Sequence, residues 1–399
     1  MRVCMITTSY PRHPGDSAGH FVESLAKHLA DEQDVHVDVF SPADHGSPTT
    51  ESQGRINVRR LRYFWPSRWQ CLAYGAGIPA NLRTKKLALL NVPCLLAAFM
   101  LALIRRAGRC DWIHAHWGVL GALALWTKPF HRRPIALTVH GSDLRTQNRV
   151  IGTLTKFAIK RCDLVMVPSE DFRDRCCELR NEPQDSPFCQ FVPHGINMPP
   201  LDRLESDWRD NSTKPKTLIS VGRLIPERRH DLLIESIPAI RDAHPDVRLI
   251  LVGDGPERTA LESQADQLGV RDHVEFVGHV PVEAVSDQLM RAGLYVSSTN
   301  AETFGLAVAE AAGHAMPIVT TDVGFPGQMV IEDETGHVVE TNNAAAIADA
   351  VLDVLNDAVR QQNMGFAMRS RLDEMKLTWS ASAARVATLY RDCYPTNFK

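Results

Sequence analysis

Tyr295-Val-Ser-Ser-Thr-Asn-Ala-Glu-Thr-Phe-Gly-Leu-Ala-Val-Ala-Glu-Ala-Ala-Gly-His-Ala-Met-Pro-Ile-Val-Thr320 is the stretch from which the fold of this chain follows. Leu294 to Val296 are apolar and strand-like, and Ser297 to Thr303 are residues that favour turns and helix caps. Phe304 to Ala312 are good helix formers, and Gly313 ends the helix before a second apolar strand. The stretch therefore predicts strand, loop, helix, turn and strand, with a ligand site at the start of the helix.

The start of a helix is a seat for phosphate because its first backbone N–H groups are free and carry a partial positive charge. Gly305 lets a ligand approach that backbone closely. Glu302 lies in the loop, and Glu310 lies roughly 8 Å along the helix at 1.5 Å per residue. A sugar at Glu302, a diphosphate at the helix start and a ribose at Glu310 would fit a nucleotide sugar, since carboxylates accept hydrogen bonds from vicinal hydroxyls. A capping acid and a solvated helix residue are the alternative at this point.

Length and charge set the class of protein. The 399 residues have an ordinary globular composition, 44% hydrophobic and 23% charged, which predicts two domains. Residues 1–200 contain 25 Lys and Arg against 17 Asp and Glu, whereas residues 201–399 contain 19 against 30. The basic first half suggests an anionic acceptor or an anionic membrane surface, although solvated faces produce the same asymmetry. The slightly negative total and the lack of a nucleic-acid motif argue against a nucleic-acid partner.

The beginning of the chain and its cysteines predict a cytoplasmic protein. Met1-Arg-Val-Cys enters a strand without the features of a signal peptide. The nine cysteines include no C-x-x-C pair, so neither a disulfide framework nor a zinc site is expected. Leu87 to Ile104 is apolar but contains Asn91 and Pro93. We expect it to be a helix buried in the first domain, with shallow contact at a membrane interface as the alternative.

The segment from Arg55 to Trp69 combines five arginines with four aromatic residues. Such a segment can bind an acceptor with a phosphate group or lie at a membrane interface, and an ordinary surface strand and loop has the same composition. Arg68 and the nearby Tyr74 are candidates for the acceptor side. Gly15 is a third, in the glycine-containing loop that joins the first strand to the first helix.

Histidines end two of the predicted strands of the first half. His114 and His116 point to one face of a strand at a period of two, which favours a place in a ligand cleft or in the core over a metal site. His140 follows another strand, Ile135 to Val139, where a lone histidine is structural more often than not. The loop before the first helix lacks G-x-G-x-x-G, so a nicotinamide site is disfavoured.

Several motifs together resemble one family. Glu302-Thr-Phe-Gly-Leu-x3-Glu310-Ala, with Glu-x7-Glu spacing, resembles the family 4 retaining glycosyltransferases of GT-B fold. Thr-x-His140-Gly-Ser-Asp, Gly222-Arg223 and Gly253-Asp-Gly-Pro resemble further motifs of the same family, so that the resemblance covers nearly the whole chain. It implies an α/β protein of two Rossmann-like domains that face an interdomain cleft. Residues 1–200 would bind the acceptor and residues 201–380 the nucleotide sugar, and the last helix, in 381–399, would cross back to the first domain.

The resemblance also implies roles for single residues. His140 would lie beside the transferred sugar, Arg223 and Arg228 would hold the donor phosphates, and Glu302 and Glu310 would hold the sugar and the ribose. Arg228 departs from the usual lysine, and an arginine fork differs in geometry from a lysine point charge. The donor-binding residues would be Gly19, Gly222, Gly253, Val277, Thr303, Phe304, Gly305, Leu306 and Glu310, and His116 joins Gly15, Arg68 and Tyr74 on the acceptor side.

The expected reaction moves a sugar from a nucleotide-diphosphate sugar to an acceptor hydroxyl with retention of configuration. Fixed positive groups would replace a divalent ion, since no Asp-x-Asp is placed to hold one, and no cofactor is expected. The acceptor would be a saccharide or lipid-linked, and peripheral contact with the inner membrane face stays open. A GT-B nucleotide-sugar epimerase and a non-catalytic nucleotide-sugar-binding subunit are the alternatives, and a nicotinamide oxidoreductase is the weakest reading.

Overall fold

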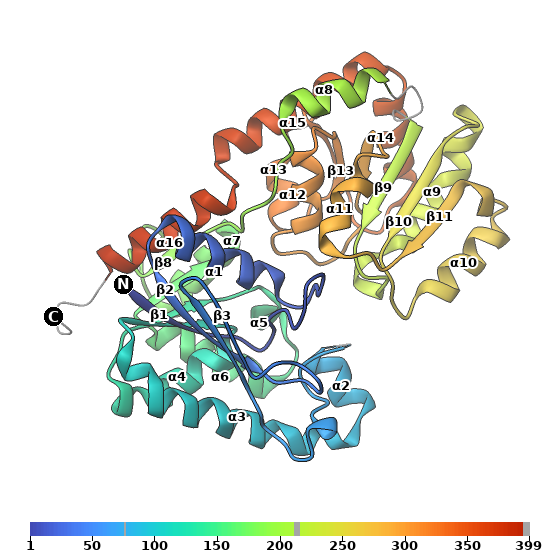
Figure 1. Ribbon diagram of the computed structural model, residues 1–399. Helices are drawn as coiled ribbons and strands as arrows, with labels where there is room; N and C mark the ends of the chain where they lie inside the picture. The colour runs from blue at the N-terminus through green and yellow to red at the C-terminus, as the bar shows by residue number, and fades with distance from the viewer. Residues whose placement is uncertain (76, 211–215, 394–399) are drawn as a thin grey trace. The chain divides into compact units, whose positions relative to one another are not determined.

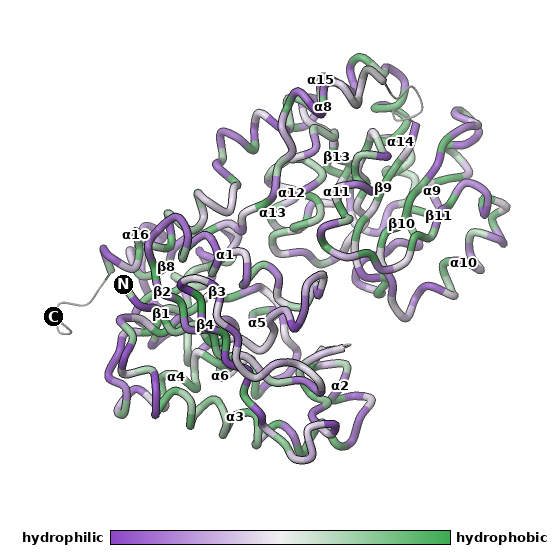
Figure 2. Tube along the Cα trace, viewed as in Figure 1, coloured by the Kyte–Doolittle hydropathy of each residue, from purple (hydrophilic) through white to green (hydrophobic). Residues whose placement is uncertain are grey.

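The computed structural model describes residues 1–75, 77–210 and 216–393 and forms two compact units. Unit 1 contains Met1–Gly195 together with Trp379–Lys399, and unit 2 contains Ile196–Thr378. From the sequence, the divisions were expected after residues 200 and 380. Figure 1 shows a sheet with helices on both faces in each unit, and in Figure 2 the strands of both sheets are mostly apolar.

The sheet of unit 1 has eight strands in the order β3-β4-β2-β1-β5-β6-β7-β8. All neighbours are parallel except β3 and β4, and Met5 of β1 lies between Val39 of β2 and His114 of β5. Buried parallel strands read as continuous apolar runs because helices cover both faces. The strands are β1 (Arg2–Ile6), β2 (His36–Pro42), β3 (Thr50–Gln53), β4 (Ile56–Leu61), β5 (Trp112–His116), β6 (Ile135–Thr138), β7 (Leu164–Val167) and β8 (Cys189–Phe191).

The helices of unit 1 divide between the two faces of this sheet. Right-handed crossovers that run from β4 towards β8 put their helices on one face, and the crossover from β1 to β2 runs the opposite way. The two apolar clusters of the unit agree with this division, because one contains α3 and α4 and the other contains α1 and α16. The helices are α1 (His20–Glu32), α2 (Ile78–Thr84), α3 (Lys86–Arg106), α4 (Gly118–His131), α5 (Ser142–Arg145), α6 (Arg149–Arg161), α7 (Glu170–Arg180) and α16 (Trp379–Asp392).

Unit 2 has a six-stranded, fully parallel sheet in the order β11-β10-β9-β12-β13-β14. The chain moves outward from β9 through β10 to β11 and then returns to the other side of β9, so the order reverses between β9 and β12. The strands are β9 (Thr217–Val221), β10 (Arg248–Val252), β11 (Val274–Gly278), β12 (Leu294–Val296), β13 (Ile318–Thr321) and β14 (Gly336–Val339). The helices are α8 (Leu201–Asp210), α9 (His230–Ala243), α10 (Arg258–Gln267), α11 (Val282–Leu289), α12 (Leu306–Gly313), α13 (Gly324–Met329), α14 (Ala344–Leu355) and α15 (Ala358–Met375).

The C-terminal helix α16 packs on unit 1, as the sequence analysis expected. Trp112 of β5 donates its indole N–H to the carbonyl oxygen of Tyr390 at 3.0 Å, and the Tyr390 hydroxyl lies 2.7 Å from Nδ1 of His114. Ser382 donates to the carbonyl oxygen of Pro193 at 2.7 Å. These contacts join the last helix to the centre of the first sheet.

The apolar segment Leu87 to Ile104 is a helix, as expected, but only one face of it is buried. With the turn that follows, residues 86–109 are long and apolar enough to cross a membrane by length and composition, although a third of the apolar window is buried. Ala88, Leu95 and Phe99 lie in the core of unit 1. The expectation of a buried helix is therefore correct for the face that lies against the sheet and wrong for the opposite face, where Leu90 is 63% exposed.

Tyr390 gives a test of the role of α16. Replacing this fully buried residue by Ala removes the ring that packs on Trp112, so we expect the free energy of unfolding to fall by about 3–5 kcal/mol. Tyr390→Phe keeps the ring and loses only the hydroxyl, so a loss of about 1–3 kcal/mol is expected. Urea unfolding measures both, and equal losses in the two variants would contradict the packing described here.

Candidate functional site

Two loops of unit 2 meet where the strand order reverses. The loop after β9 and the loop after β12 leave the carboxyl ends of adjacent parallel strands, the place where open α/β sheets bind ligands. Thr299 and Asn300 both donate to the carbonyl oxygen of Glu227 at 3.0 Å, and the Ser298 hydroxyl donates to that of Arg229 at 2.6 Å. The polar residues of the β12 loop therefore fasten it to the β9 loop.

Arg228 and Glu302 form an ion pair across these two loops. The Glu302 side chain is 12% exposed and that of Arg228 is 33% exposed, so the pair is open to solvent on the arginine side. Burial lowers the pKa of Arg228, but the charge and the hydrogen bond of Glu302 outweigh this effect and raise that pKa above its usual value. The second Glu302 oxygen accepts the backbone N–H of Thr303 at 2.7 Å. Both side chains are thus held beside the start of α12.

The helix after β12 begins two residues later than the sequence analysis predicted. α12 spans Leu306–Gly313, and Thr303 and Phe304 form a bend before it. Gly305 caps the helix with φ 69°, and a Cβ there would lie 2.6 Å from Cγ of Pro326 and 3.3 Å from Cγ of Glu302. A residue with a side chain would be strained and would also press on Glu302. Gly305 is therefore needed for the left-handed backbone conformation before α12 and for the close approach of the Glu302 side chain.

Glu310 lies on the second turn of α12 and is partly buried. Burial disfavours the charged carboxylate and raises its pKa from 4.5 to about 7. Perturbed carboxylates of this kind gather at functional sites, although structural positions also produce them. The Glu310 carboxylate at this position can accept hydrogen bonds from the donor groups of a bound ligand.

The turn after β9, which contains Gly222, and the turn after β10, which contains Gly253, pack backbone against backbone. A Cβ at Gly253, which has φ 136°, would lie 1.9 Å from the carbonyl oxygen of Gly222. A Cβ at Gly222 would meet only the Arg228 side chain, at 3.8 Å. Arg223 beside it is exposed, and its side chain forms no ion pair with any residue that the structure describes. Val277 of β11 is half-buried. Gly253 is thus required by packing, whereas Arg223 is available to a ligand.

Two candidate residues of unit 1, His116 and His140, belong to a column of four imidazole rings, those of His114, His116, His140 and His194. The ring centroids are stacked in sequence at 4.4, 5.3 and 5.6 Å, and His116 Nδ1 lies 3.1 Å from His140 Nε2. His116 is 1% exposed, so the predicted acceptor-side residue lies behind His140 and not at a surface. This placement gives His116 a supporting position next to the predicted sugar-binding histidine.

Burial keeps these imidazoles neutral. It lowers the pKa of His114 to about 3 and that of His194 to about 4. Burial, and then the neighbouring imidazoles, also hold the pKa of His116 and of His140 well below 6.5. A neutral imidazole both donates and accepts a hydrogen bond, which is the form that positions a hydroxyl without transferring its proton.

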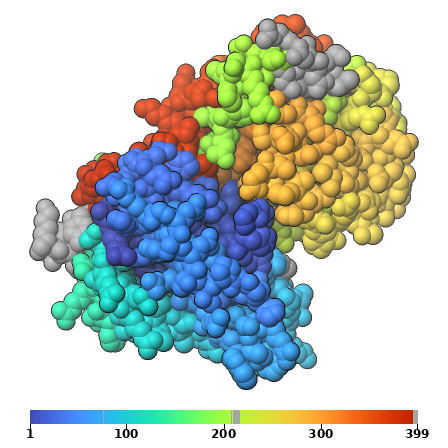
Figure 3. Space-filling model, in the orientation of Figure 1, coloured from blue at the N-terminus to red at the C-terminus, as the bar shows by residue number. Residues whose placement is uncertain are grey.

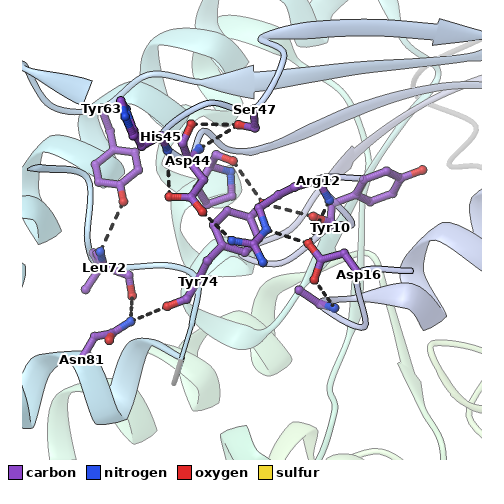
Figure 4. Close-up of polar contacts among 12 residues, drawn as sticks. Tyr10, Arg12, Asp16, Asp44, His45, Ser47, Tyr63, Leu72, Tyr74 and Asn81 are labelled. Carbon is purple, nitrogen blue, oxygen red and sulfur yellow. Dashed lines mark hydrogen bonds and ion pairs between the residues drawn. The ribbon is translucent and has the colours of Figure 1, made fainter. Parts of the chain in front are cut away.

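The other candidates of unit 1 lie at the loop after β1, and Figure 4 shows the network around them. Arg12 bridges Asp16 and Asp44 at 2.6 and 2.5 Å, and its guanidinium lies 4.5 Å from the centroid of the Tyr74 ring. The Tyr74 hydroxyl donates to the carbonyl oxygens of Tyr10 and Pro42. Tyr74 is therefore buried beneath the loop after β1. The contact with an acceptor that was predicted for Tyr74 would have to be made by residues next to it.

Gly15, Gly19 and Arg68 occupy different surroundings. Gly19 caps α1 with φ 71°, and a Cβ there would lie 2.2 Å from the carbonyl oxygen of Ser9. Gly15 has φ 78° in the same loop, and Arg68 is exposed on the short turn Ser67–Trp69. Arg12, Asp16 and Asp44 were not expected from the sequence, because only the parallel pairing of β1 with β2 brings the two loops together.

One group of possible metal ligands occurs among the residues that the structure describes. Glu332, Asp333 and His337 offer ligand atoms within 4.8 Å of one another. His337 already contacts Glu332 at 2.6 Å through Nδ1 and Asp353 at 2.9 Å through Nε2. Both nitrogens already contact carboxylates, and the group lies on the β14 side of unit 2, apart from the pair of Arg228 and Glu302.

Two Rossmann-like units, a ligand-type helix start at a switch point and a last helix that returns to the first unit define the GT-B class of glycosyltransferase. The model named "Glycosyltransferase Family 4" matches residues 18–197, and the model "Glycosyl transferases group 1" matches residues 202–371. The chain belongs to glycosyltransferase family 4. The expected fold class and the expected activity as a glycosyltransferase are thereby confirmed.

Individual relatives agree with this assignment. The chain is 28% identical to the glycogen synthase of Mycobacterium tuberculosis over 98% of its own length and 94% of that protein. The structure of sucrose-phosphate synthase from Thermosynechococcus elongatus matches with a TM-score of 0.79 at 21% identity, over 98% of this chain and 99% of that one. Anabaena HepE in complex with UDP-glucose matches with a TM-score of 0.71 at 16% identity, over 98% and 100% of the two chains.

The pKa of Glu310 predicts how one substitution changes stability with pH. A carboxylate whose pKa is raised in the folded state stabilises the protein fully below about pH 4.5, and this contribution is lost as the pH rises to about 7. Glu310→Gln removes the buried charge, so at pH 8 the variant should be more stable than the wild type by up to about 3 kcal/mol.

At pH 4 the two proteins should differ far less. Urea unfolding at both pH values gives the comparison, and Glu374→Gln, at an exposed position of α15, serves as the control. A pH-independent difference between Glu310→Gln and the wild type would contradict the raised pKa.

Proposed function

We propose that this glycosyltransferase moves a sugar from a nucleotide-diphosphate sugar to an acceptor hydroxyl with retention of configuration. The observation that supports the proposal best is the ion pair of Arg228 and Glu302, held beside the start of α12 at the switch point of unit 2. A cation for phosphate, a carboxylate for hydroxyls and free helix amides lie together there. A nucleotide-diphosphate sugar requires all of these groups.

The chemical difficulty is the charge that develops on the leaving diphosphate while the sugar becomes oxocarbenium-like. Arg223, Arg228 and the backbone amides at the start of α12 stabilise the leaving diphosphate, and fixed positive groups of this kind cost no reorganisation at the moment of reaction. No divalent ion or cofactor takes part in the proposed reaction. The acceptor hydroxyl attacks the face from which the diphosphate leaves, and a donor phosphate oxygen takes its proton.

The remaining side chains position the donor. Glu302 accepts hydrogen bonds from hydroxyls of the transferred sugar, and its pairing with Arg228 holds it in place before the donor binds. Glu310 accepts the ribose hydroxyls. His140, neutral because it is buried, donates to a hydroxyl of the sugar. None of these residues has to transfer a proton.

We further propose a saccharide or lipid-linked acceptor, a cytoplasmic location and peripheral contact with the inner membrane face, without a nucleic-acid partner. The relatives glycogen synthase and sucrose-phosphate synthase have different acceptors by name, so the family leaves the acceptor open. The structure of HepE with UDP-glucose supports a nucleotide-sugar donor. The basic composition of the first half supports an anionic acceptor or surface.

The proposal predicts a large loss of transfer when the pair is broken. Glu302→Gln and Arg228→Met should each lower sugar transfer by about 10²- to 10³-fold, the effect of removing one group that stabilises transition-state charge. A panel of UDP-, GDP- and ADP-sugars, screened first by thermal shift, supplies the donor for the assay.

A matched control separates this effect from a general change in the loop. Glu227→Gln makes the same charge change at an exposed position next to Arg228 and should leave transfer nearly unchanged. Retained melting temperatures show that the variants fold. Near-wild-type turnover in Glu302→Gln would refute the assignment, and sugar isomerisation without an acceptor would favour an epimerase.

A further inference from the structure

The solvent-facing side of α3 is an apolar stripe that no described part of the chain covers. Its exposed residues recur every three to four positions, opposite the core-facing stripe of Leu95, Phe99 and Leu103. Leu90 is 63% exposed and Leu101 is 46% exposed. From one end to the other, the exposed stripe contains Lys86, Leu89, Leu90, Pro93, Ala97, Leu101, Ile104, Arg105 and Arg106. A surface helix of a soluble domain normally presents polar residues on this side.

The neighbouring helices extend the stripe into a surface. α3 packs beside α4, and α4 packs beside α6, on the same face of the unit 1 sheet (Figure 1). The C-terminal end of α4 exposes Trp126 and Phe130, at 51% and 66%, and α6 exposes Val150 and Phe157. We call the solvent-facing side of α3, α4 and α6 the basic apolar face. The space-filling view shows teal atoms of this part of the chain along the lower edge of unit 1 (Figure 3).

The charge of this face is predominantly positive, and one of its cations, Lys128, pairs with Asp163 at 2.8 Å just after α6. Between them α3, α4 and α6 contain no Asp or Glu. Their cationic residues are Lys86, Arg105, Arg106, Lys128, Arg149, Lys156, Lys160 and Arg161. The next helix on the same side, α7, is different, because Glu170, Asp171, Asp174 and Glu178 offset its three arginines. On α3, α4 and α6 the positive charge therefore coincides with exposed apolar side chains.

We propose that the basic apolar face docks on the surface of an anionic lipid bilayer, with α3 parallel to the membrane plane. This inference goes beyond the proposed sugar transfer, because it gives the peripheral membrane contact a surface on the molecule. Leucines, Trp126 and Phe130 would enter the interface between headgroups and acyl chains, and the lysines and arginines around them would contact lipid phosphates. Membrane contact through Arg55 to Trp69, considered from the sequence, is not needed for this arrangement.

The pattern fits a bilayer better than the other occupants. Nucleic acid requires a cationic surface but gains nothing from an exposed leucine stripe flanked by paired arginines. A second copy of this chain would place two sets of cationic residues opposite each other, with no Asp or Glu on α3, α4 or α6 of either copy to offset them. α3 does not cross the bilayer in this arrangement, since its other face is part of the core of unit 1.

The test is cosedimentation of the full-length protein with vesicles of phosphatidylcholine alone and with vesicles of phosphatidylcholine and the anionic lipid phosphatidylglycerol. The protein should bind the anionic vesicles at least tenfold more tightly, and 0.5 M salt should weaken this binding, since the Debye length then falls below about 5 Å. A variant with Leu90→Ser, Leu101→Ser, Arg105→Glu and Arg106→Glu should lose at least tenfold in vesicle affinity. These positions are exposed, so the variant should retain the melting temperature of the wild type.

A control variant carries Val359→Ser and Arg248→Glu, two exposed positions in unit 2, and should bind vesicles as the wild type does. Donor binding by thermal shift should be unchanged in both variants, so a failure of the proposed sugar transfer would not alter the vesicle result. Equal vesicle binding by the wild type and the α3 variant would overturn the proposal, as would no binding of the wild type to anionic vesicles. Self-association of the wild type in light scattering that the α3 variant abolishes would overturn it in favour of a second copy.

Discussion

The ion pair of Arg228 and Glu302 is the interaction on which the chemistry of unit 2 depends. It joins two loops that are 74 residues apart in sequence, and it exists because β9 and β12 are neighbours in the sheet. The cost of partly burying a carboxylate is offset by the guanidinium and by the backbone N–H of Thr303. Around the pair, side-chain hydroxyls of the β12 loop hold the β9 loop. The site is therefore rigid before any ligand arrives.

Glycines contribute to this arrangement because, without a Cβ, they let the backbones of neighbouring turns lie in direct contact. Gly253 presses on Gly222, and Gly324 would press on the carbonyl oxygen of Glu302 if it carried a Cβ, at 2.6 Å. A side chain at either position would push on one of the two loops that hold the charged pair. The glycine-rich appearance of the family motifs thus has two causes, the approach of a phosphate and the approach of one loop to another.

Unit 1 supports its candidate residue in a different way, by burial. The imidazole column begins at Tyr390 on the C-terminal helix and continues through His114 and His116 to His140. Since every ring is neutral, the column can be packed without compensating charges. Eight of the 25 Lys and Arg residues of the first half lie on the outer helices α3, α4 and α6, which contain no Asp or Glu. Part of the basic character of the first half thus lies next to exposed leucines and aromatic rings.

The sequence by itself determined the local elements and the family. The apolar runs, the turn glycines and the Glu-x7-Glu spacing are patterns of neighbouring residues, so they can be recognised in the sequence alone. Only the tertiary structure decided which side chains meet, because long-range pairing leaves no periodic signal. It paired Arg228 with Glu302, placed His116 behind His140 and covered Tyr74 with Arg12. It also decided that one apolar face of α3 packs in the core while the other faces solvent, a distinction that an evenly apolar helix cannot show in its sequence.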